Sequence, residues 1–268
     1  MLRSISSFPV SAGMTALGNW GATIGLLMVQ DVDRKFKTSR LGAILSLLEP
    51  ILLVIAILVT RTILLERIPR YGQSPAVWYS SGIFPFYLFI RLSARGRGTP
   101  YRAVQRFPRV TGTDYVIAST ITETALFLTT MVAWFTGMWL WGLEEAVPKS
   151  IIDCIIPLSL FMALGIGFGL VNSAISTRFQ MWNFIYGFIG RGLMFASGVF
   201  WVADLMPYVV RSYAIWNPLD HGIVWFRLGL YGRYPHFTLD RDYLIGYAGI
   251  VLFLGIIAYV STLRVSKE

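Results

Sequence analysis

The stretch that most constrains this chain is residues 40–60, RLGAILSLLEPILLVIAILVT, where a basic approach turns into an apolar run through Glu49 and Pro50. A helix needs about 20 residues to cross a hydrocarbon layer about 30 Å thick. The apolar run covers residues 43–65 and is therefore long enough to span. Over the whole chain, 55% of the residues are hydrophobic and only 14% are charged. Soluble globular domains do not have this composition. The sequence therefore predicts an all-α integral membrane protein.

Six apolar runs are long enough, or nearly long enough, to span a bilayer. The second run is the shortest and contains Pro85, so we expect it to be tilted, kinked or extended into its flanks. An even number of spans places both termini on the same side of the membrane. The six predicted transmembrane helices are residues 43–65, 77–92, 115–141, 151–176, 181–202 and 243–263.

The basic residues predict which side holds the termini. With the N-terminus in the cytoplasm, the inner segments carry fourteen of the 23 Lys and Arg residues and the outer segments carry eight, while Arg191 lies within a span. Segments rich in Lys and Arg stay on the cytoplasmic side, so we expect both termini to be cytoplasmic. The same bias explains the net charge of +9 without nucleic acid as a partner, since no basic stretch carries an RNA- or DNA-binding pattern.

The chain divides into a cytoplasmic N-terminal segment at 1–42, a six-helix transmembrane domain at 43–263 and a cytoplasmic tail at 264–268. We expect no cleavable signal peptide at the N-terminus, because the lone Arg3 precedes no dense apolar core. Residues 17–39 join an apolar part that is too short to span with a charged part. They predict an amphipathic helix at the membrane interface, and a solvated linker is the alternative.

The cytoplasmic loop at 91–114 holds six Arg residues and no acidic residue before Asp114. The positive-inside rule is sufficient to explain its charge. Tyr101, Val104 and Phe107 lie among these Arg residues near helical spacing. We therefore expect a short helix that offers an apolar face to a cytosolic partner.

The outer segment at 203–242 is too apolar for an exposed loop, yet two prolines interrupt it. It predicts two short re-entrant or gate helices, near 206–215 and 218–230, that lie in or dip into the outer leaflet. Asn217 suits the N-cap of the second helix, and Pro218 suits its first turn.

Arg191 does not fit a passive span. A guanidinium at the centre of a bilayer costs at least about 2.5 kcal/mol, so this side chain should face protein or water. An anionic substrate path, a carboxylate partner such as Glu123, or snorkelling toward the interface would each satisfy it. Aromatic residues near the span ends fit interfacial belts, and stacking against sugar rings is the alternative.

Two groups of glycines predict close contacts between helices. Small residues let helix backbones approach in lipid, and the spacing does not match a nucleotide-binding loop. The groups are Gly165, Gly167 and Gly169, and Gly187, Gly190 and Gly192.

Little in the chain points to chemistry of its own. No acidic pair, His pair or Ser/His constellation recurs at a span end with catalytic spacing, so no catalytic site is expected. Cys154 is the single cysteine and fits a small buried residue, which excludes an intrachain disulfide. The two histidines, His221 and His236, both lie in the last outer segment, and no metal site is expected.

Four stretches resemble the membrane subunit of type-2 ABC transporters that export capsular polysaccharide, and the resemblance runs over nearly the whole chain. They are RKFKTSRLGAILSLLEP at 34–50, SGIFPFYLF at 81–89, the turn at 109–114, and NPLDHGIVWFRLGLY at 217–231.

The resemblance implies the permease subunit of an ATP-driven exporter that moves lipid-linked, acidic capsular polysaccharide across the bacterial inner membrane. It implies a homodimer that forms the channel, two copies of a separate cytosolic ATPase that holds ATP and Mg, and export partners in the periplasm and outer membrane. No cofactor is expected in this chain. An exporter of O-antigen, teichoic acid or a lipophilic small molecule is the nearest alternative, followed by a scaffold and a membrane enzyme.

Topology and the resemblance together nominate three groups of functional residues. The substrate-path candidates are Arg191, Trp182, Phe86, Tyr87, Phe89 and Trp201. The ATPase-coupling candidates are Arg34, Lys35, Arg40, Tyr101, Val104, Arg106 and Phe107. The outer-gate candidates are Asn217, Pro218, His221, Trp225 and Arg227.

Overall fold

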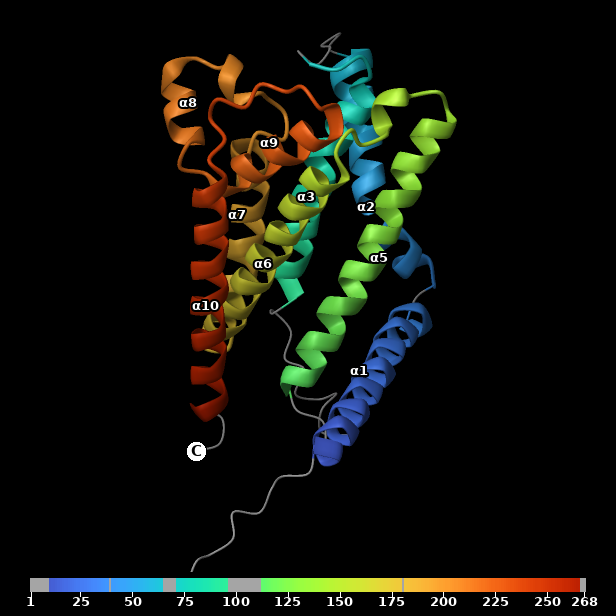
Figure 1. Ribbon diagram of the computed structural model, residues 1–268, viewed down its shortest axis with the longest axis vertical. Helices are drawn as coiled ribbons and strands as arrows, with labels where there is room; N and C mark the ends of the chain where they lie inside the picture. Colours follow the sequence, from blue (N-terminus) through green and yellow to red (C-terminus); the bar gives the residue numbers. More distant parts are fainter. Residues whose placement is uncertain (1–9, 39, 65–70, 96–111, 180, 266–268) are drawn as a thin grey trace, which may run out of the picture. The chain divides into compact units, whose positions relative to one another are not determined.

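The computed structural model describes residues 10–38, 40–64, 71–95, 112–179 and 181–265 (Figure 1). The regular structure of these residues is helical throughout, which confirms the all-α class. The chain forms two compact units, one from residues 1–43 and 100–122 and the other from residues 44–99 and 123–268.

The first unit contains α1 (Val10–Thr38) and the first turns of α5 (Gly112–Leu140). Ile24 and Leu27 of α1 pack against Ala118 of α5 in a small apolar cluster. The indole nitrogen of Trp20 donates a hydrogen bond to the carboxylate of Asp114, at 2.9 Å. The predicted amphipathic segment at 17–39 is therefore helical through residue 38, and its place at the membrane interface stays a prediction.

The second unit contains α2 from residue 44 onward, α5 from residue 123 onward and the remaining helices. Helix α2 continues into one π-helical turn, Val59–Leu64, and two single 3₁₀ turns lie at Glu144–Ala146 and Ala203–Leu205. The helices are α2 (Arg40–Leu58), α3 (Pro75–Arg95), the rest of α5, α6 (Ile151–Ser176), α7 (Trp182–Ala196), α8 (Tyr208–Ala214), α9 (Pro218–Tyr231) and α10 (Arg241–Val265).

Four helical segments among the described residues are long and apolar enough to cross a membrane. They coincide with the first, third, fourth and sixth predicted spans. Helix α3 covers the second predicted span with 21 residues, and α7 covers part of the fifth with 15. The matching segments are Ile44–Thr62, Asp114–Leu140, Ile151–Ser176 and Arg241–Thr262.

Two predicted boundaries need correction. The fifth span was expected to reach residue 202, but α7 ends at Ala196 because Gly198 turns the chain with φ +69°. The cytoplasmic loop was expected at 91–114, but α3 continues to Arg95 and α5 begins at Gly112. In both cases the apolar pattern alone did not mark where the helix stops.

Glycines let α6 pack closely against α3 and α10. A Cβ atom at Gly165 would lie 2.7 Å from the Cβ of Leu92, and one at Gly255 would lie 2.5 Å from the carbonyl oxygen of Gly167. The predicted close contacts of α6 are confirmed. On α7 only Gly190 meets a neighbour, the side chain of Ile90. Gly187 and Gly192 have nothing within 4 Å of an added Cβ atom, so the single chain shows no such contact for them.

The two short helices predicted between the last two spans are confirmed as α8 and α9, which lie at the same end of the bundle as the start of α10 (Figure 1). Their place at the outer side of the membrane stays a prediction. Asn217 caps α9, because its side-chain oxygen accepts a hydrogen bond from the backbone N–H of Leu219 at 3.1 Å. Pro218 occupies the first helical position, where its missing N–H is harmless. Helix α9 packs between α3 and α6, so most of its side chains are buried.

Candidate functional site

Arg227 of α9 is completely buried. Its Nε donates to the hydroxyl of Ser81 at 3.1 Å, and Nη1 donates to the phenol oxygen of Tyr234 at 3.3 Å. Two backbone carbonyls in the turn after α7 accept the other hydrogen bonds, Gly198 from Nη1 at 2.9 Å and Val199 from Nη2 at 2.8 Å. The guanidinium therefore ties α9 to α3 and to the turn after α7.

Trp78 and Gly82 complete the surroundings of this arginine. The carbon at the centre of the Arg227 guanidinium lies 3.6 Å from the centroid of the Trp78 ring, a cation–π contact. A Cβ atom at Gly82 would lie 2.7 Å from Nη2, so a glycine is needed beside the guanidinium. Because its contacts are internal and its exposure is 0%, Arg227 holds helices together rather than binding a solute.

His221 links α9 to both of its flanking segments. Its Nδ1 accepts a hydrogen bond from the backbone N–H of Asp240 at 3.0 Å, so Nε2 carries the proton and donates to the carbonyl of Ile215 at 2.9 Å. Burial lowers the pKa of His221, which favours the neutral ring. Asn217 adds a bond from its amide to the carbonyl of Ala196, at 2.9 Å.

Trp225 connects α9 to α6 and α10. Its indole nitrogen donates to the carboxylate of Asp153 at 2.9 Å, and the guanidinium of Arg241 lies 4.8 Å from its ring centroid. Arg241 also lies 3.7 Å from the same carboxylate. The structure thus places the five predicted outer-gate residues on α9 and its N-cap, and four of them, Asn217, His221, Trp225 and Arg227, each make a distinct side-chain contact.

Asp220 is a buried acid next to this assembly that sequence reasoning did not nominate. Its side chain is 1% exposed, and its Oδ1 has no hydrogen-bond partner among the described residues. Burial raises the pKa of Asp220 to about 7, with Arg227 opposing the rise and Asp204 adding to it. The carboxyl group is therefore partly protonated at neutral pH.

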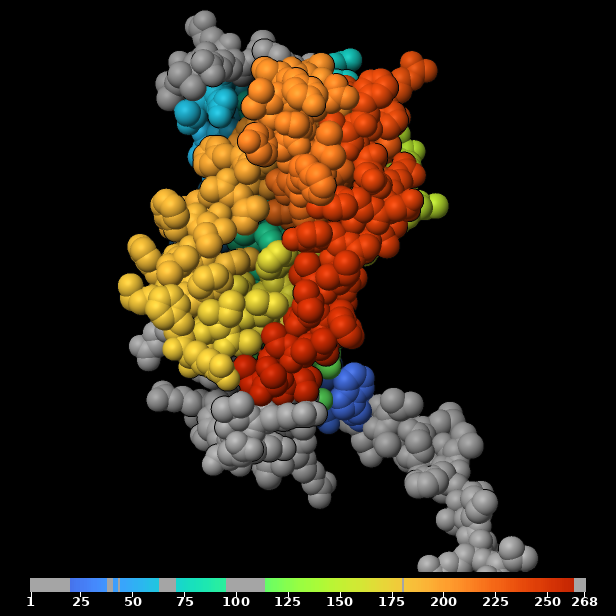
Figure 2. All heavy atoms as spheres, turned by 90° about the vertical axis from the view of Figure 1, so that its left-hand side faces the viewer, coloured from blue at the N-terminus to red at the C-terminus, as the bar shows by residue number. Residues whose placement is uncertain are grey.

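Arg191 lies on an exposed face of α7. Three phenylalanines lie at helical spacing from Arg191: Phe184 is seven residues before it, Phe188 is three residues before it and Phe195 is four residues after it. This spacing places all four side chains on one helix face. The three phenylalanines are 76%, 72% and 57% exposed. We call these four residues the α7 stripe; Figure 2 shows α7 at the surface beside α6.

Two tryptophans among the path candidates fix the ends of α7. The indole nitrogen of Trp182 donates to the side-chain oxygen of the buried Asn172 at 2.9 Å, and the amide of Asn172 donates to the carbonyl of Ser93 at 3.0 Å. Trp201 donates to the carbonyl of Phe195 at 2.7 Å. Both indoles therefore position the helix that carries Arg191.

The three path candidates on α3 lie apart from the α7 stripe. Phe86 and Phe89 are buried in the main core, and Tyr87 is half-buried. Phe89 contacts the ring of Phe168 edge-on, with centroids 5.6 Å apart. The structure thus places these rings in the packing of α3 and does not bring them together with Arg191.

The carboxylate proposed as a partner for Arg191 is engaged elsewhere. Glu123 of α5 pairs with Arg91 of α3 at 2.8 Å, and Arg91 also lies 3.4 Å from Glu49 and donates to the carbonyl of Ser46. The prediction that Glu123 serves Arg191 was therefore wrong. Within the residues that the structure describes, no carboxylate lies within 4 Å of the Arg191 guanidinium.

The coupling candidates that are described lie near the end of α1 and the start of α2. Arg34 pairs with Asp31 at 2.8 Å and donates a hydrogen bond to the hydroxyl of Tyr115 on α5. Lys35 lies 3.9 Å from the same Asp31. Arg40 is the first residue of α2. The other four candidates, Tyr101, Val104, Arg106 and Phe107, lie outside the described residues.

Comparison with known proteins identifies the family to which this chain belongs. The family described as ABC-2 type transporter matches residues 23–231, which include the α7 stripe and the contacts of Arg227 to α3 and the turn after α7. The chain belongs to the ABC-2 type transporter family. It is a multi-pass membrane protein, since its apolar helices agree with that assignment.

Relatives of this ABC-2 type chain carry specific names. The polysialic acid transport protein KpsM of Escherichia coli is 23% identical over 239 residues, which cover 88% of this chain and 92% of the relative. The capsule polysaccharide export inner-membrane protein CtrC of Neisseria meningitidis serogroup B is 24% identical over 241 residues, 89% of each chain. The capsule polysaccharide export inner-membrane protein BexB of Haemophilus influenzae is 20% identical over 215 residues, 79% of this chain and 80% of the relative.

Sequence reasoning missed the partners that bury Arg227 in this ABC-2 type domain. Trp78, Ser81 and Gly82 come from α3, and Tyr234 follows α9. One signal was present: SGIFPFYLF at 81–89 and NPLDHGIVWFRLGLY at 217–231 both carried the family resemblance, and Ser81 and Arg227 are in contact. Distance along the chain hid that the two stretches meet.

Proposed function

We propose that this chain is the permease subunit of an ATP-driven exporter that carries lipid-linked capsular polysaccharide across the bacterial inner membrane. The names of KpsM, CtrC and BexB, which refer to polysialic acid transport or to inner-membrane export of capsule polysaccharide, support the substrate class and the location. Membership of the ABC-2 type family supports a separate cytosolic ATPase, which would hold ATP and Mg.

The α7 stripe is the observation that carries this proposal. A guanidinium in a membrane-level helix needs protein or water beside it, because lipid does not solvate it. Arg191 is exposed in the single chain, with an exposed phenylalanine on either side of it along the helix. A cation attracts the carboxylates of an acidic glycan, and apolar ring faces of sugars pack on phenylalanine side chains. Teichoic acid is also anionic, but the named relatives favour capsule.

A homodimer would complete the path. One copy leaves the α7 stripe open, so a second copy related by a two-fold axis would enclose the polymer between two such faces. Helices α3 and α7 then serve as the second and fifth spans, and both termini lie in the cytoplasm. On the far side the polymer passes to export proteins of the periplasm and outer membrane.

The outer assembly around Arg227 then acts as the gate beside the end of the path. Helix α9 is held at three places: by Arg227 to α3, by His221 to the segment before α10, and by Trp225 to α6. The first unit, with Arg34 and Lys35 near the end of α1, would contact the ATPase together with the segment that holds Tyr101 to Phe107.

Locating the glycan in cells tests the proposal. The gene is deleted and replaced by wild type, Arg191→Ala or a control, Arg178→Ala, which removes an exposed cation outside the α7 stripe. We expect polymer trapped in the cytoplasm of the deletion, restored to the surface by wild type and by the control, and not restored by Arg191→Ala at equal protein level. Normal surface glycan in the deletion, with no redundant exporter, would refute the export role.

A further inference from the structure

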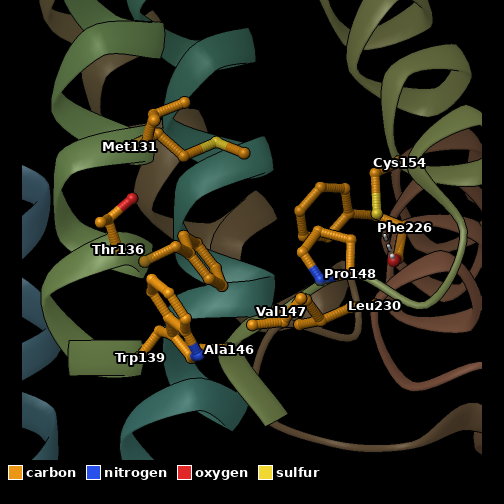
Figure 3. A pocket seen from close by; sticks show the side chains of 11 residues that line it. Met131, Thr136, Trp139, Ala146, Val147, Pro148, Cys154, Phe226 and Leu230 are labelled. Carbon is orange, nitrogen blue, oxygen red and sulfur yellow. Dashed lines mark hydrogen bonds between the residues drawn. The ribbon is translucent and has the colours of Figure 1, made fainter. Parts of the chain in front are cut away.

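A separate apolar pocket of about 390 Å³ lies between α5 and the outer part of α6 and α9 (Figure 3). Met131, Thr136 and Trp139 of α5 face Pro148, Phe226 and Leu230 across it. The volume falls in the range of small-molecule sites, and the walls are almost entirely hydrocarbon and aromatic. Such walls suit an alkyl chain and give a polar solute no partner.

The wall opposite α5 is held firmly in place. A Cβ atom at Gly229 would lie 2.6 Å from the backbone of Asp153, so α9 and α6 touch there without side chains between them. The backbone N–H groups of Lys149 and Ser150 donate to the carbonyl of Gly229 at 3.0 and 2.9 Å. Cys154 donates a weak hydrogen bond to the carbonyl of Phe226, at 3.8 Å. The wall formed by α6 and α9 is therefore in place before a ligand binds.

The position of the pocket indicates which hydrocarbon reaches it. Two of the helices that line it, α5 and α6, are candidate membrane spans, and the pocket lies at the C-terminal end of α5 and the N-terminal end of α6. Trp139 and Trp141 are 51% and 88% exposed at this end, as expected at the level of lipid headgroups. The opening therefore faces one leaflet close to its headgroup region.

The loop beside the pocket offers both signs of charge. Lys149 follows the lining residue Pro148 and is exposed, and Glu144 is exposed in the same loop. The neighbouring Glu145 is already used, since its carboxylate accepts the backbone N–H groups of Gln73 and Ser74 at the start of α3. A lysine can pair with a phosphate and a glutamate with an ammonium, so this loop offers partners for both charges of a zwitterionic headgroup.

We propose that this pocket binds one acyl chain of phosphatidylethanolamine from the surrounding leaflet, with the headgroup at Lys149 and Glu144. The outer part of α5 lies on the other side of α3 and α6 from α7, so the site is separate from the α7 stripe (Figure 1). The bound chain contacts Phe226, the residue before Arg227, and so supports α9 from the lipid side. This inference does not depend on the identity of the exported glycan.

Photo-crosslinking tests the site on the full chain with its ATPase in nanodiscs. The probe is phosphatidylethanolamine with a diazirine in its acyl chain, and mass spectrometry locates the adducts. Thr136→Trp fills the pocket from α5, and Ala133→Trp is the matched control on an exposed position of the same helix that does not line the pocket. We expect adducts near Cys154 and Phe226 in wild type and in the control, reduced at least about five-fold in Thr136→Trp.

Adducts at the outward-facing Ile152, which is 69% exposed, report ordinary lipid contact and should be equal in all three proteins. The proposal is overturned if labelling near Cys154 does not exceed that at Ile152 or is unchanged by Thr136→Trp. It is also overturned if the host's lipid-linked glycan displaces the probe, because the occupant would then be the exported anchor. If a phosphatidylglycerol probe labels the pocket equally, the site does not select a zwitterionic headgroup, and the proposed role of Lys149 and Glu144 is wrong.

Discussion

At the residue scale, Arg227 shows how a full charge is kept inside this protein. Two backbone carbonyls, the hydroxyls of Ser81 and Tyr234 and the face of Trp78 surround the guanidinium. Hydrogen bonds to a charged group are stronger than those between neutral groups. A buried carbonyl left without its donor lowers the stability of the folded protein by about 1–3 kcal/mol. Arg227 therefore stabilises mainly the contacts of α9 with α3 and with the turn after α7.

Replacing Arg227 should loosen the contacts that hold α9 to α3 and to the turn after α7. In Arg227→Lys the charge remains, but an ammonium cannot reach both carbonyls and both hydroxyls, so we expect a loss of about 2–4 kcal/mol and a lower midpoint of thermal unfolding. Arg233→Ala, at an exposed position, is the control and should leave the midpoint unchanged. Thermal unfolding of the purified proteins in detergent measures both. An unchanged midpoint in Arg227→Lys would mean that the contacts around Arg227 do not hold α9.

Asp220 should make stability depend on pH. Burial raises the pKa of Asp220 to about 7 from its ordinary 3.8, so the folded protein keeps a proton that the unfolded chain releases. Its contribution to stability therefore falls as pH rises from about 4 and is lowest above about 7. We expect Asp220→Asn to raise the unfolding midpoint by a few degrees at pH 8 and to change it little at pH 4.

The comparison of the two proteins cancels the titration of His221, which both of them share. A variant that is less stable than wild type at pH 8 would contradict this account. It would show that the ionised carboxylate stabilises the fold through Arg227 by more than burial opposes it.

At the scale of elements, the close packing of α6 and α10 depends on glycines. The backbones of Gly167 and Gly255 approach so closely that a Cβ atom on either would meet the other helix within 2.7 Å. Gly249 lies on the same helix as Gly255 but has nothing within 4 Å of an added Cβ atom. The two positions are thus a matched pair for testing the contact.

A side chain at Gly255 should force α6 and α10 apart. Overpacking of a well-packed contact costs about 1–3 kcal/mol, so Gly255→Leu should lower the thermal unfolding midpoint, whereas Gly249→Leu should not. Both variants are measured in the same detergent. Equal unfolding midpoints for the two variants would show that α6 and α10 can separate without loss of stability. Their contact would then contribute little to the free energy of unfolding.

How far the sequence predicts these elements depends on the kind of signal. Apolar length predicts the four long spans, and the two prolines with Asn217 predict α8 and α9 within a few residues. Apolar length does not predict where α7 ends, because the turn at Gly198 lies inside an apolar run. It also does not predict that Glu123 pairs with Arg91, since such pairs depend on how helices far apart in sequence lie side by side.

At the scale of the whole molecule, the proposed transport path requires more than one copy of this chain. The α7 stripe is exposed in the single chain, while most side chains of α9 are buried by contacts within it. We propose that two copies enclose the polymer along the α7 stripe and that the ATPase moves the helices around it. The central claim is therefore that the glycan contacts α7 during export.

A cross-linker placed on the stripe tests this claim most directly. p-Benzoylphenylalanine replaces Phe188 on α7 or, as the control, Phe253 on α10, which is 63% exposed and outside the stripe. Cells making the glycan are irradiated, and the purified chain is probed for attached polymer. The account predicts polymer on the chain labelled at Phe188 and none at Phe253. Attachment at Phe253 alone, or at neither position while surface glycan is still produced, would contradict a path along α7.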